Sequence, residues 1–135
     1  MPTKKNYYVC LRFKGKPKLH MTLRYLANLC PVQMVEVIDD INQIMNNKIV
    51  SPHPFHVRFS IEAWYGPQHT VRVLEPNDDW VWPNWMLLLM SGLPTGSQKY
   101  GWHPHVACEF QALNIEVIAV SLMCKKVEVA RWDLT

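Results

Sequence analysis

The chain contains a histidine within residues 18–25, a stretch that alternates strictly between polar and apolar side chains. Successive side chains of a β-strand point to opposite faces, so the alternation predicts a strand with one polar face. That face carries Lys18, His20, Thr22 and Arg24. An imidazole, a hydroxyl and two cations on one surface suit a phosphodiester, which needs proton transfer, a neutral donor to a phosphoryl oxygen and positive charge.

A second histidine pattern lies in residues 102–110, where His103, His105, Ala107 and Glu109 are predicted to share a strand face. In-line displacement at phosphorus needs a base on the attacking oxygen and an acid on the leaving oxygen. Two histidines on facing strands can fill both roles. We therefore predict that His20 is the base and His105 the acid, with the Thr22 hydroxyl donating to a phosphoryl oxygen.

The elements that must position these residues follow from hydrophobic periodicity. Period-two alternation and turn signals predict strands at 7–13, 19–25, 56–62, 70–74, 102–110, 115–123 and 127–132. Helical spacing predicts a helix from Pro31 to Met45, and Asn77 and Asp78 are candidate caps for a second helix over 79–90. Runs of strands separated by helices indicate an α+β fold. The order of elements in the second half of the chain loosely repeats that in the first half.

Composition limits the class of protein. The chain has 135 residues, of which 49% are apolar, so we expect a single domain over residues 1–135. No apolar run before residue 31 is long enough to span a bilayer, and four scattered cysteines without a CxxC pair favour reduced thiols in a cytoplasm. The net charge is +3, and many lysines lie near the N-terminus. This pattern favours the binding of anionic ligands at that edge, and the alternative is an ordinary solvated surface.

The two histidine motifs resemble those of a known family. His20-Met21-Thr22-Leu23 is similar to the first His-x-Thr/Ser-hydrophobic motif of the LigT-like two-histidine (2H) phosphoesterases, and residues 103–106 resemble that family's HPHh segment. The resemblance implies a bilobal fold, with antiparallel sheets lining a central cleft and helices outside. It also implies a phosphodiesterase that uses neither a metal ion nor a cofactor.

Within that family the chain looks most like the phage anti-CBASS phosphodiesterases, which cleave cyclic di- and trinucleotide immune signals. This resemblance implies immune evasion in the host cytoplasm. One departure concerns Ala107, where the family's second motif usually ends in Thr or Ser. Either Lys99, Tyr100, His103 or a backbone N–H supplies the missing contact, or the activity is reduced. We favour a specialised enzyme.

Several aromatic and charged residues are candidates for binding a nucleotide. Trp64 precedes a turn, and Glu128 and Trp132 are predicted to share a strand face on which a ring could stack and a carboxylate could accept from a base amine. Tyr8 and Arg12, opposite the apolar face of the first strand, are candidates of the same kind. Simple packing is the alternative for the two tryptophans.

Three functions stay open at this point. The first is cleavage of a cyclic nucleotide or short oligonucleotide; the second is a phosphodiesterase for 2′,3′-cyclic RNA ends or 2′-5′ oligonucleotides. The third is a non-catalytic protein that sequesters its nucleotide, and the missing hydroxyl at Ala107 would fit this function.

We expect no zinc site. Pro52 and Pro54 interrupt the candidate ligand pair His53 and His56, and Cys108 is predicted to point to the opposite face from His105. We also expect a monomer that binds neither membranes nor long duplex nucleic acid.

Overall fold

The computed structural model describes residues 3–47, 49, 51–78, 80–93, 102–107 and 111–135. These residues form an antiparallel six-stranded sheet and two α-helices, which confirms the predicted α+β class. No helix in the described residues is long and apolar enough to cross a membrane. The elements, in chain order, are β1 Lys5–Phe13, β2 Lys16–Leu29, α1 Pro31–Met45, β3 Phe55–Tyr65, the 3₁₀ turn η1 Pro67–His69, β4 Val71–Pro76, α2 Asn84–Gly92, β5 Leu113–Cys124 and β6 Val127–Asp133.

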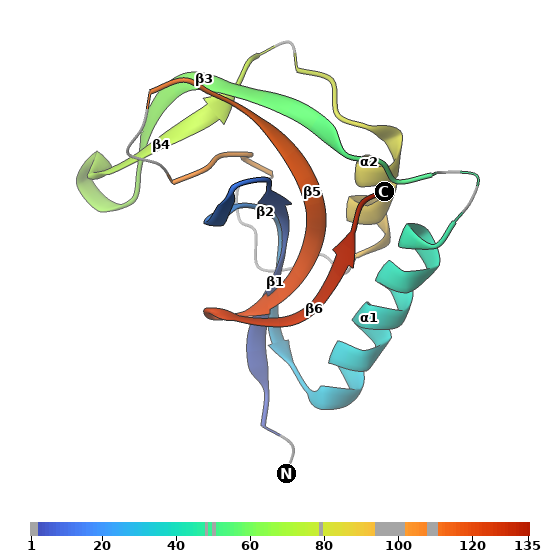
Figure 1. Cartoon of the computed structure of the whole chain (residues 1–135). Coiled ribbons are helices and arrows are strands. Elements are labelled where there is room, and N and C mark those ends of the chain that lie inside the picture. Colours follow the sequence, from blue (N-terminus) through green and yellow to red (C-terminus); the bar gives the residue numbers. More distant parts are fainter. Residues whose placement is uncertain (1–2, 48, 50, 79, 94–101, 108–110) are drawn as a thin grey trace.

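The long strand β5 joins two hairpins into one sheet with the order β2-β1-β5-β3-β4 (Figure 1). Its first residues, from Leu113 to Val117, pair with β3, and its later residues pair with β1 and with β6. The strand curves strongly across the molecule, orange in Figure 1. As a result the β1–β2 and β3–β4 hairpins lie at opposite ends of one curved surface.

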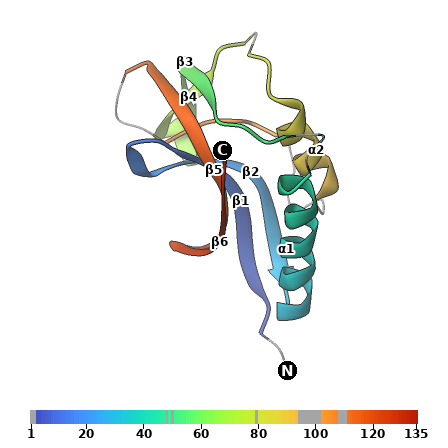
Figure 2. The same ribbon diagram turned by 45° about the vertical axis from the view of Figure 1, so that its right-hand side comes forward.

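Both helices lie on the same side of this sheet (Figure 2). Helix α1 begins where expected because Pro31 occupies its first turn and the side chain of Gln33 accepts the backbone N–H of Cys30 at 2.9 Å. Val37 and Ile41 are buried against the sheet. The core therefore lies between the helices and one sheet face, and the other face is left to carry polar side chains.

Among the register shifts of the sheet, two β-bulges change the face on which a predicted site residue lies. In the β1–β2 pairing Val9 lies opposite Arg24 and Cys10 lies opposite Thr22, so Leu23 is an extra residue in β2. Arg24 is thereby turned to the helix side, where its Nη2 donates to the carbonyl of Met90 at 2.9 Å. The predicted shared face of Lys18, His20, Thr22 and Arg24 is therefore wrong at Arg24.

The second bulge lies between β5 and β6. Leu122 pairs with Ala130 and Met123 pairs with Glu128, which makes Val129 the extra residue of β6. Glu128 and Trp132 consequently point to opposite faces of the sheet, and the predicted shared face of these two residues is wrong.

Two predicted elements differ in the structure. Helix α2 begins at Asn84, after Pro83, so Asn77 and Asp78 do not cap it. Residues 102–107, predicted as part of a strand, contain one isolated bridge, between Val106 and Leu74. The remainder of that predicted strand, 108–110, lies outside the described residues.

Candidate active site

His20 lies on the sheet face that the helices leave open. Its pairing partner across the β1–β2 ladder is Arg12, one of the predicted binding residues. The Tyr8 ring, from the same strand as Arg12, lies with its centroid 5.5 Å from that of the imidazole. His20 is also hydrogen-bonded to the backbone of Lys18, two residues earlier. The imidazole is thus held in place by its own strand and by the neighbouring strand.

The pKa of His20 is lowered below the ordinary value of a histidine. The largest cause is burial, which disfavours the charged imidazolium, and the second is the positive charge of Arg12. The hydrogen bond to the Lys18 backbone acts in the opposite direction, and the charge of His105 lowers the pKa further. Near neutral pH His20 is therefore a neutral imidazole that can accept a proton.

Arg12→Gln is expected to raise the pKa of His20. Removing a neighbouring positive charge makes protonation of the imidazole easier, so the titration midpoint moves to higher pH. NMR titration of the His20 ring should show a midpoint below about 6.5 in the wild type and a higher one in the variant. An unchanged or lower midpoint in Arg12→Gln would show that the guanidinium does not control this group.

His105 is carried by residues 102–107, which run between the two hairpins (Figure 1). At one end the indole Nε1 of Trp102 donates to the backbone carbonyl of Thr22 at 3.2 Å. At the other end Val106 exchanges two backbone hydrogen bonds of 2.9 Å with Leu74 of β4. These ties bring the second histidine segment to the strand that carries the first, close enough for the charge of His105 to act on His20.

The two histidines are held in similar ways. Nδ1 of His105 donates to the carbonyl of His103 at 2.7 Å, two residues earlier in the chain. His20 has the equivalent bond to the backbone of Lys18. For His105 this bond fixes the tautomer and leaves Nε2 for a substrate oxygen. His103, predicted as a binding residue, is exposed and contributes this backbone carbonyl.

Tyr65 and Glu75 were missed in the sequence and adjoin His105. The Tyr65 ring meets the imidazole edge-on with centroids 4.6 Å apart, and the Tyr65 hydroxyl donates to the Glu75 carboxylate. Antiparallel pairing at the Leu74–Val106 bridge places Glu75 opposite His105. Burial and the bond to Glu75 raise the pKa of Tyr65, which keeps its hydroxyl protonated. Alternation along β3 puts Tyr65 on the face opposite Trp64, but the sequence alone gives no signal that His105 would meet it there.

Thr22 lies next along the same face as His20 and is partly buried. Its pairing partner Cys10 is fully buried, and burial raises the pKa of the Cys10 thiol to about 11, which leaves the thiol protonated and unreactive. Beyond Cys10, Ser121 donates to the Glu128 carboxylate at 2.8 Å, and Arg131 lies 3.6 Å from the same carboxylate. Glu128 therefore lies on the histidine face, with its carboxylate already engaged.

The two predicted stacking tryptophans are placed away from the histidines. Trp132 is on the helix side of the sheet, where its Nε1 donates to Oδ1 of Asn42 in α1 at 2.6 Å. Trp64 is 49% exposed and points to the opposite face from Tyr65, the residue that contacts His105. Tyr100, another predicted binding residue, lies outside the described residues, as does Lys99.

Trp132→Ala is expected to lower the free energy of unfolding by about 2 to 4 kcal/mol, because a partly buried ring that packs against α1 is lost. Nucleotide affinity should not change. Thermal unfolding and nucleotide titration measure the two effects, and Trp132→Phe should recover most of the stability while losing the bond to Asn42. A loss of affinity at unchanged stability would instead assign Trp132 to the binding site.

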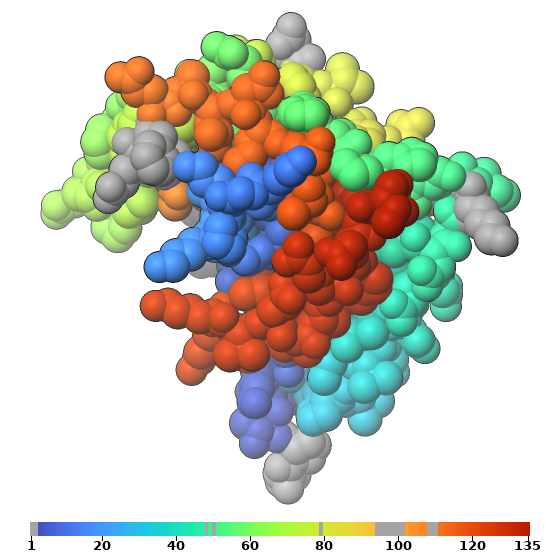
Figure 3. All heavy atoms as spheres, viewed as in Figure 1, coloured from blue at the N-terminus to red at the C-terminus, as the bar shows by residue number. Residues whose placement is uncertain are grey.

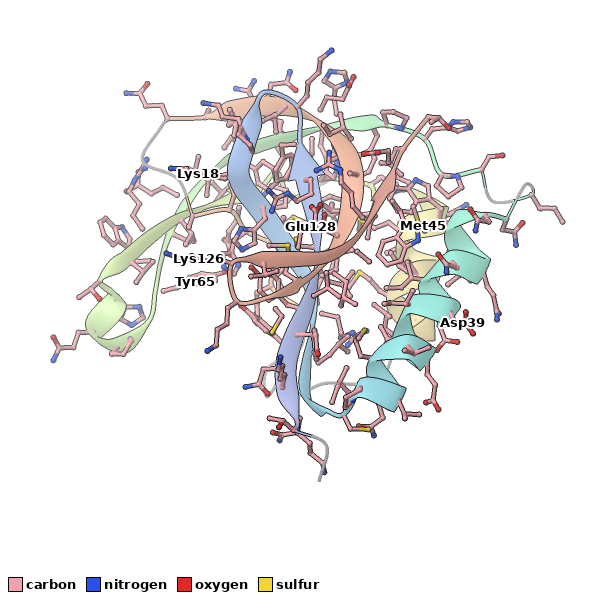
Figure 4. The ribbon with its side chains drawn as sticks, turned by 60° about the horizontal axis from the view of Figure 1, so that its bottom comes forward. Lys18, Asp39, Met45, Tyr65, Lys126 and Glu128 are labelled. Atoms are coloured by element: carbon pink, nitrogen blue, oxygen red, sulfur yellow. The ribbon has the colours of Figure 1, made fainter. Side chains whose placement is uncertain are left out.

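Two lysines, Lys18 and Lys126, lie on one side of the molecule. The β1–β2 turn and the β5–β6 turn project from the same side of the molecule, blue and red in Figure 3. In Figure 4, Lys18, Tyr65 and Lys126 lie on the side of the view away from α1, and Glu128 lies between them and that helix. Within the described residues no group of three or more His, Cys, Asp or Glu side chains could hold a metal ion.

Solved structures share this fold. E. coli LigT complexed with 3′-AMP has a TM-score of 0.61 and 12% sequence identity, covering 100% of this chain and 99% of that one. LigT has also been solved with ATP and with NADP+. TT0787 of Thermus thermophilus has a TM-score of 0.64 and 12% identity, covering 96% of this chain and 97% of that one. No family model matches the sequence, and no curated protein matches it. The chain therefore has the fold of LigT and TT0787.

Proposed function

We propose that the chain is a metal-independent phosphodiesterase of the two-histidine type that acts on small nucleotides. The observation that supports the proposal is that His20, which pairs with Arg12 and lies beside Thr22 on one sheet face, feels the charge of His105 from a separate segment that is tied to the same strand through Trp102. The likeness to LigT, which has been solved with 3′-AMP, ATP and NADP+, adds support for a nucleotide ligand.

The proposed reaction divides two proton transfers between the histidines. Neutral His20 takes the proton from the attacking hydroxyl or water as its oxygen bonds to phosphorus. His105, protonated on Nε2, gives its proton to the leaving oxygen as the other P–O bond breaks. The Thr22 hydroxyl donates to a non-bridging oxygen, and the guanidinium of Arg12 stabilises the negative charge that builds up there. At the end of the reaction His20 is protonated and His105 is neutral.

The substrates we propose are cyclic di- and trinucleotide immune signals, so that the protein would act in phage evasion of CBASS defence. The cationic side chains of Arg12 and Lys18 and the aromatic rings of Tyr8 and Tyr65 suit a ligand with several phosphates and bases. We further propose that residues 1–135 form one catalytic unit that works as a cytoplasmic monomer.

Turnover in EDTA tests the proposal. The substrate panel holds 3′,3′-cyclic dinucleotides, a cyclic trinucleotide, 2′,3′-cyclic mononucleotides and 2′-5′ oligoadenylate, and the products are separated by chromatography. Cleavage of the cyclic di- or trinucleotides in EDTA is the expected result. Loss of activity with rescue by zinc or manganese would contradict metal independence. Cleavage confined to 2′,3′-cyclic or 2′-5′ substrates would favour the RNA-end function, and tight binding without turnover would favour sequestration.

A further inference from the structure

A hollow of about 1060 Å³ opens beside the histidine face, where the N-terminal end of β1 and the C-terminal end of β2 meet the β5–β6 turn. None of the proposed catalytic residues lines it. The lining includes lysines, tyrosines and valines from three segments: Lys4, Lys5, Tyr8, Tyr25, Lys125 and Val127. Its volume is comparable with that of the pockets that hold whole small ligands.

The hollow begins one aromatic ring away from His20. The Tyr8 ring lies 5.5 Å from the His20 imidazole on one side and 6.1 Å from the Tyr25 ring on the other, centroid to centroid. The bulge at Leu23 is what turns Tyr25 onto this face. The Tyr8 hydroxyl donates to the backbone carbonyl of Lys125 at 2.8 Å, which fixes the β5–β6 turn as a wall of the hollow.

The chemistry of the walls indicates a flat aromatic group with a negative charge. Tyr25 is 51% exposed and Val127 is 65% exposed, so apolar surface faces solvent inside a concave site. Three lysines, Lys4, Lys5 and Lys125, are among the residues that line the hollow, and none of the described residues that line it carries a carboxylate. A nucleoside phosphate combines a ring that stacks on tyrosine with an anion that lysine attracts.

We propose that this hollow binds a second nucleotide of the substrate. The first nucleotide is held between the histidines, and the second is attached to the other side of the scissile phosphate. The proposal rests on the proposed function. It makes the protein selective for substrates with a nucleotide on each side of the cleaved bond, because a lone 2′,3′-cyclic mononucleotide leaves the hollow empty.

Equilibrium binding tests the proposal without depending on turnover. In a His105→Ala background, cyclic di-AMP and 2′,3′-cyclic AMP are titrated by calorimetry into the parent protein and into Tyr25→Ala, Tyr25→Trp and Lys125→Gln variants. Tyr25→Ala is expected to raise the Kd for cyclic di-AMP roughly tenfold, the effect of losing one base–aromatic stack, and to leave the Kd for 2′,3′-cyclic AMP unchanged. Tyr25→Trp should retain affinity, and Lys125→Gln should weaken cyclic di-AMP binding most at low salt.

The control is Val81→Ala, an 86% exposed valine on the segment before α2, which should change neither Kd. Equal weakening of both ligands by Tyr25→Ala would mean that Tyr25 supports Tyr8 and His20 and forms no subsite. An unchanged Kd for cyclic di-AMP, or no binding of it by the parent, would also overturn the proposal. Failure of the proposed function is distinguishable, since it appears as binding without turnover in the wild-type chain.

Discussion

His20→Ala and His105→Ala are each expected to lower kcat by roughly 10² to 10⁴, the usual contribution of a positioned acid or base. In the proposed reaction each imidazole moves one of the two protons, and the residual rate of each variant would come from binding and charge stabilisation. Because the two groups act in one reaction event, the double variant should lose little more than the worse single variant. Steady-state rates on the preferred nucleotide measure the effect.

His53→Ala is the matched control for these variants. His53 is exposed, and its Nδ1 bonds to the backbone carbonyl of Thr135 at 2.8 Å, at the C-terminal end of the chain. Its substitution should leave kcat unchanged. All three variants should keep cooperative thermal unfolding. If His20→Ala or His105→Ala turned over substrate at the wild-type rate, the assignment of that histidine would be wrong.

Thr22→Val is expected to lower kcat by about 10² to 10³, with a smaller rise in KM. A hydroxyl that donates to a phosphoryl oxygen contributes most when negative charge builds up there, so its loss appears in the rate of the chemical step. Valine has nearly the same shape and leaves the backbone carbonyl that accepts from Trp102 in place. Thr70→Val, which removes a hydroxyl bonded to the Pro67 carbonyl in the β3–β4 turn, is the control and should leave kcat unchanged.

Ala107→Thr tests the same idea from the second motif. Ala107 and His105 flank Val106 at the bridge with Leu74, so a threonine hydroxyl there would stand on the same side as the imidazole. A faster variant would mean that the natural site is degenerate. A neutral or slower Ala107→Thr variant would support a site that is specialised to work without that hydroxyl.

For the first motif, wild-type rates in the Thr22→Val variant would contradict a role for the Thr22 hydroxyl.

Long regular elements could be predicted from the sequence. Alternation from Tyr7 to Phe13 and the helical spacing from Pro31 to Met45 gave correct elements, because burial of one face imposes a simple period on each. His20 and Thr22 could be placed on one face for the same reason, since no bulge separates them.

The two bulges could not be predicted. Neither Leu23 nor Val129 is a glycine or proline that would mark an irregular position, and each inserts one residue that inverts the predicted face of the residues directly after it. Arg24 and Trp132, predicted to lie on polar faces, are instead bonded to the helices. The contact of Tyr65 with His105 was equally hidden, because it depends on a bridge between segments far apart in the sequence.

The two histidines lie in parts of the structure that we expect to open at different free energies. His20 lies within a strand of fourteen residues that is paired to β1 along its length, whereas His105 adjoins an isolated bridge. Proteins open locally at free energies well below that of global unfolding where few hydrogen bonds hold a segment. Amide hydrogens at the bridge should therefore exchange with solvent before those of β2. Warming should therefore separate the His105 segment from His20 while the sheet is still folded, and the temperature limit of the proposed activity should lie below the melting temperature.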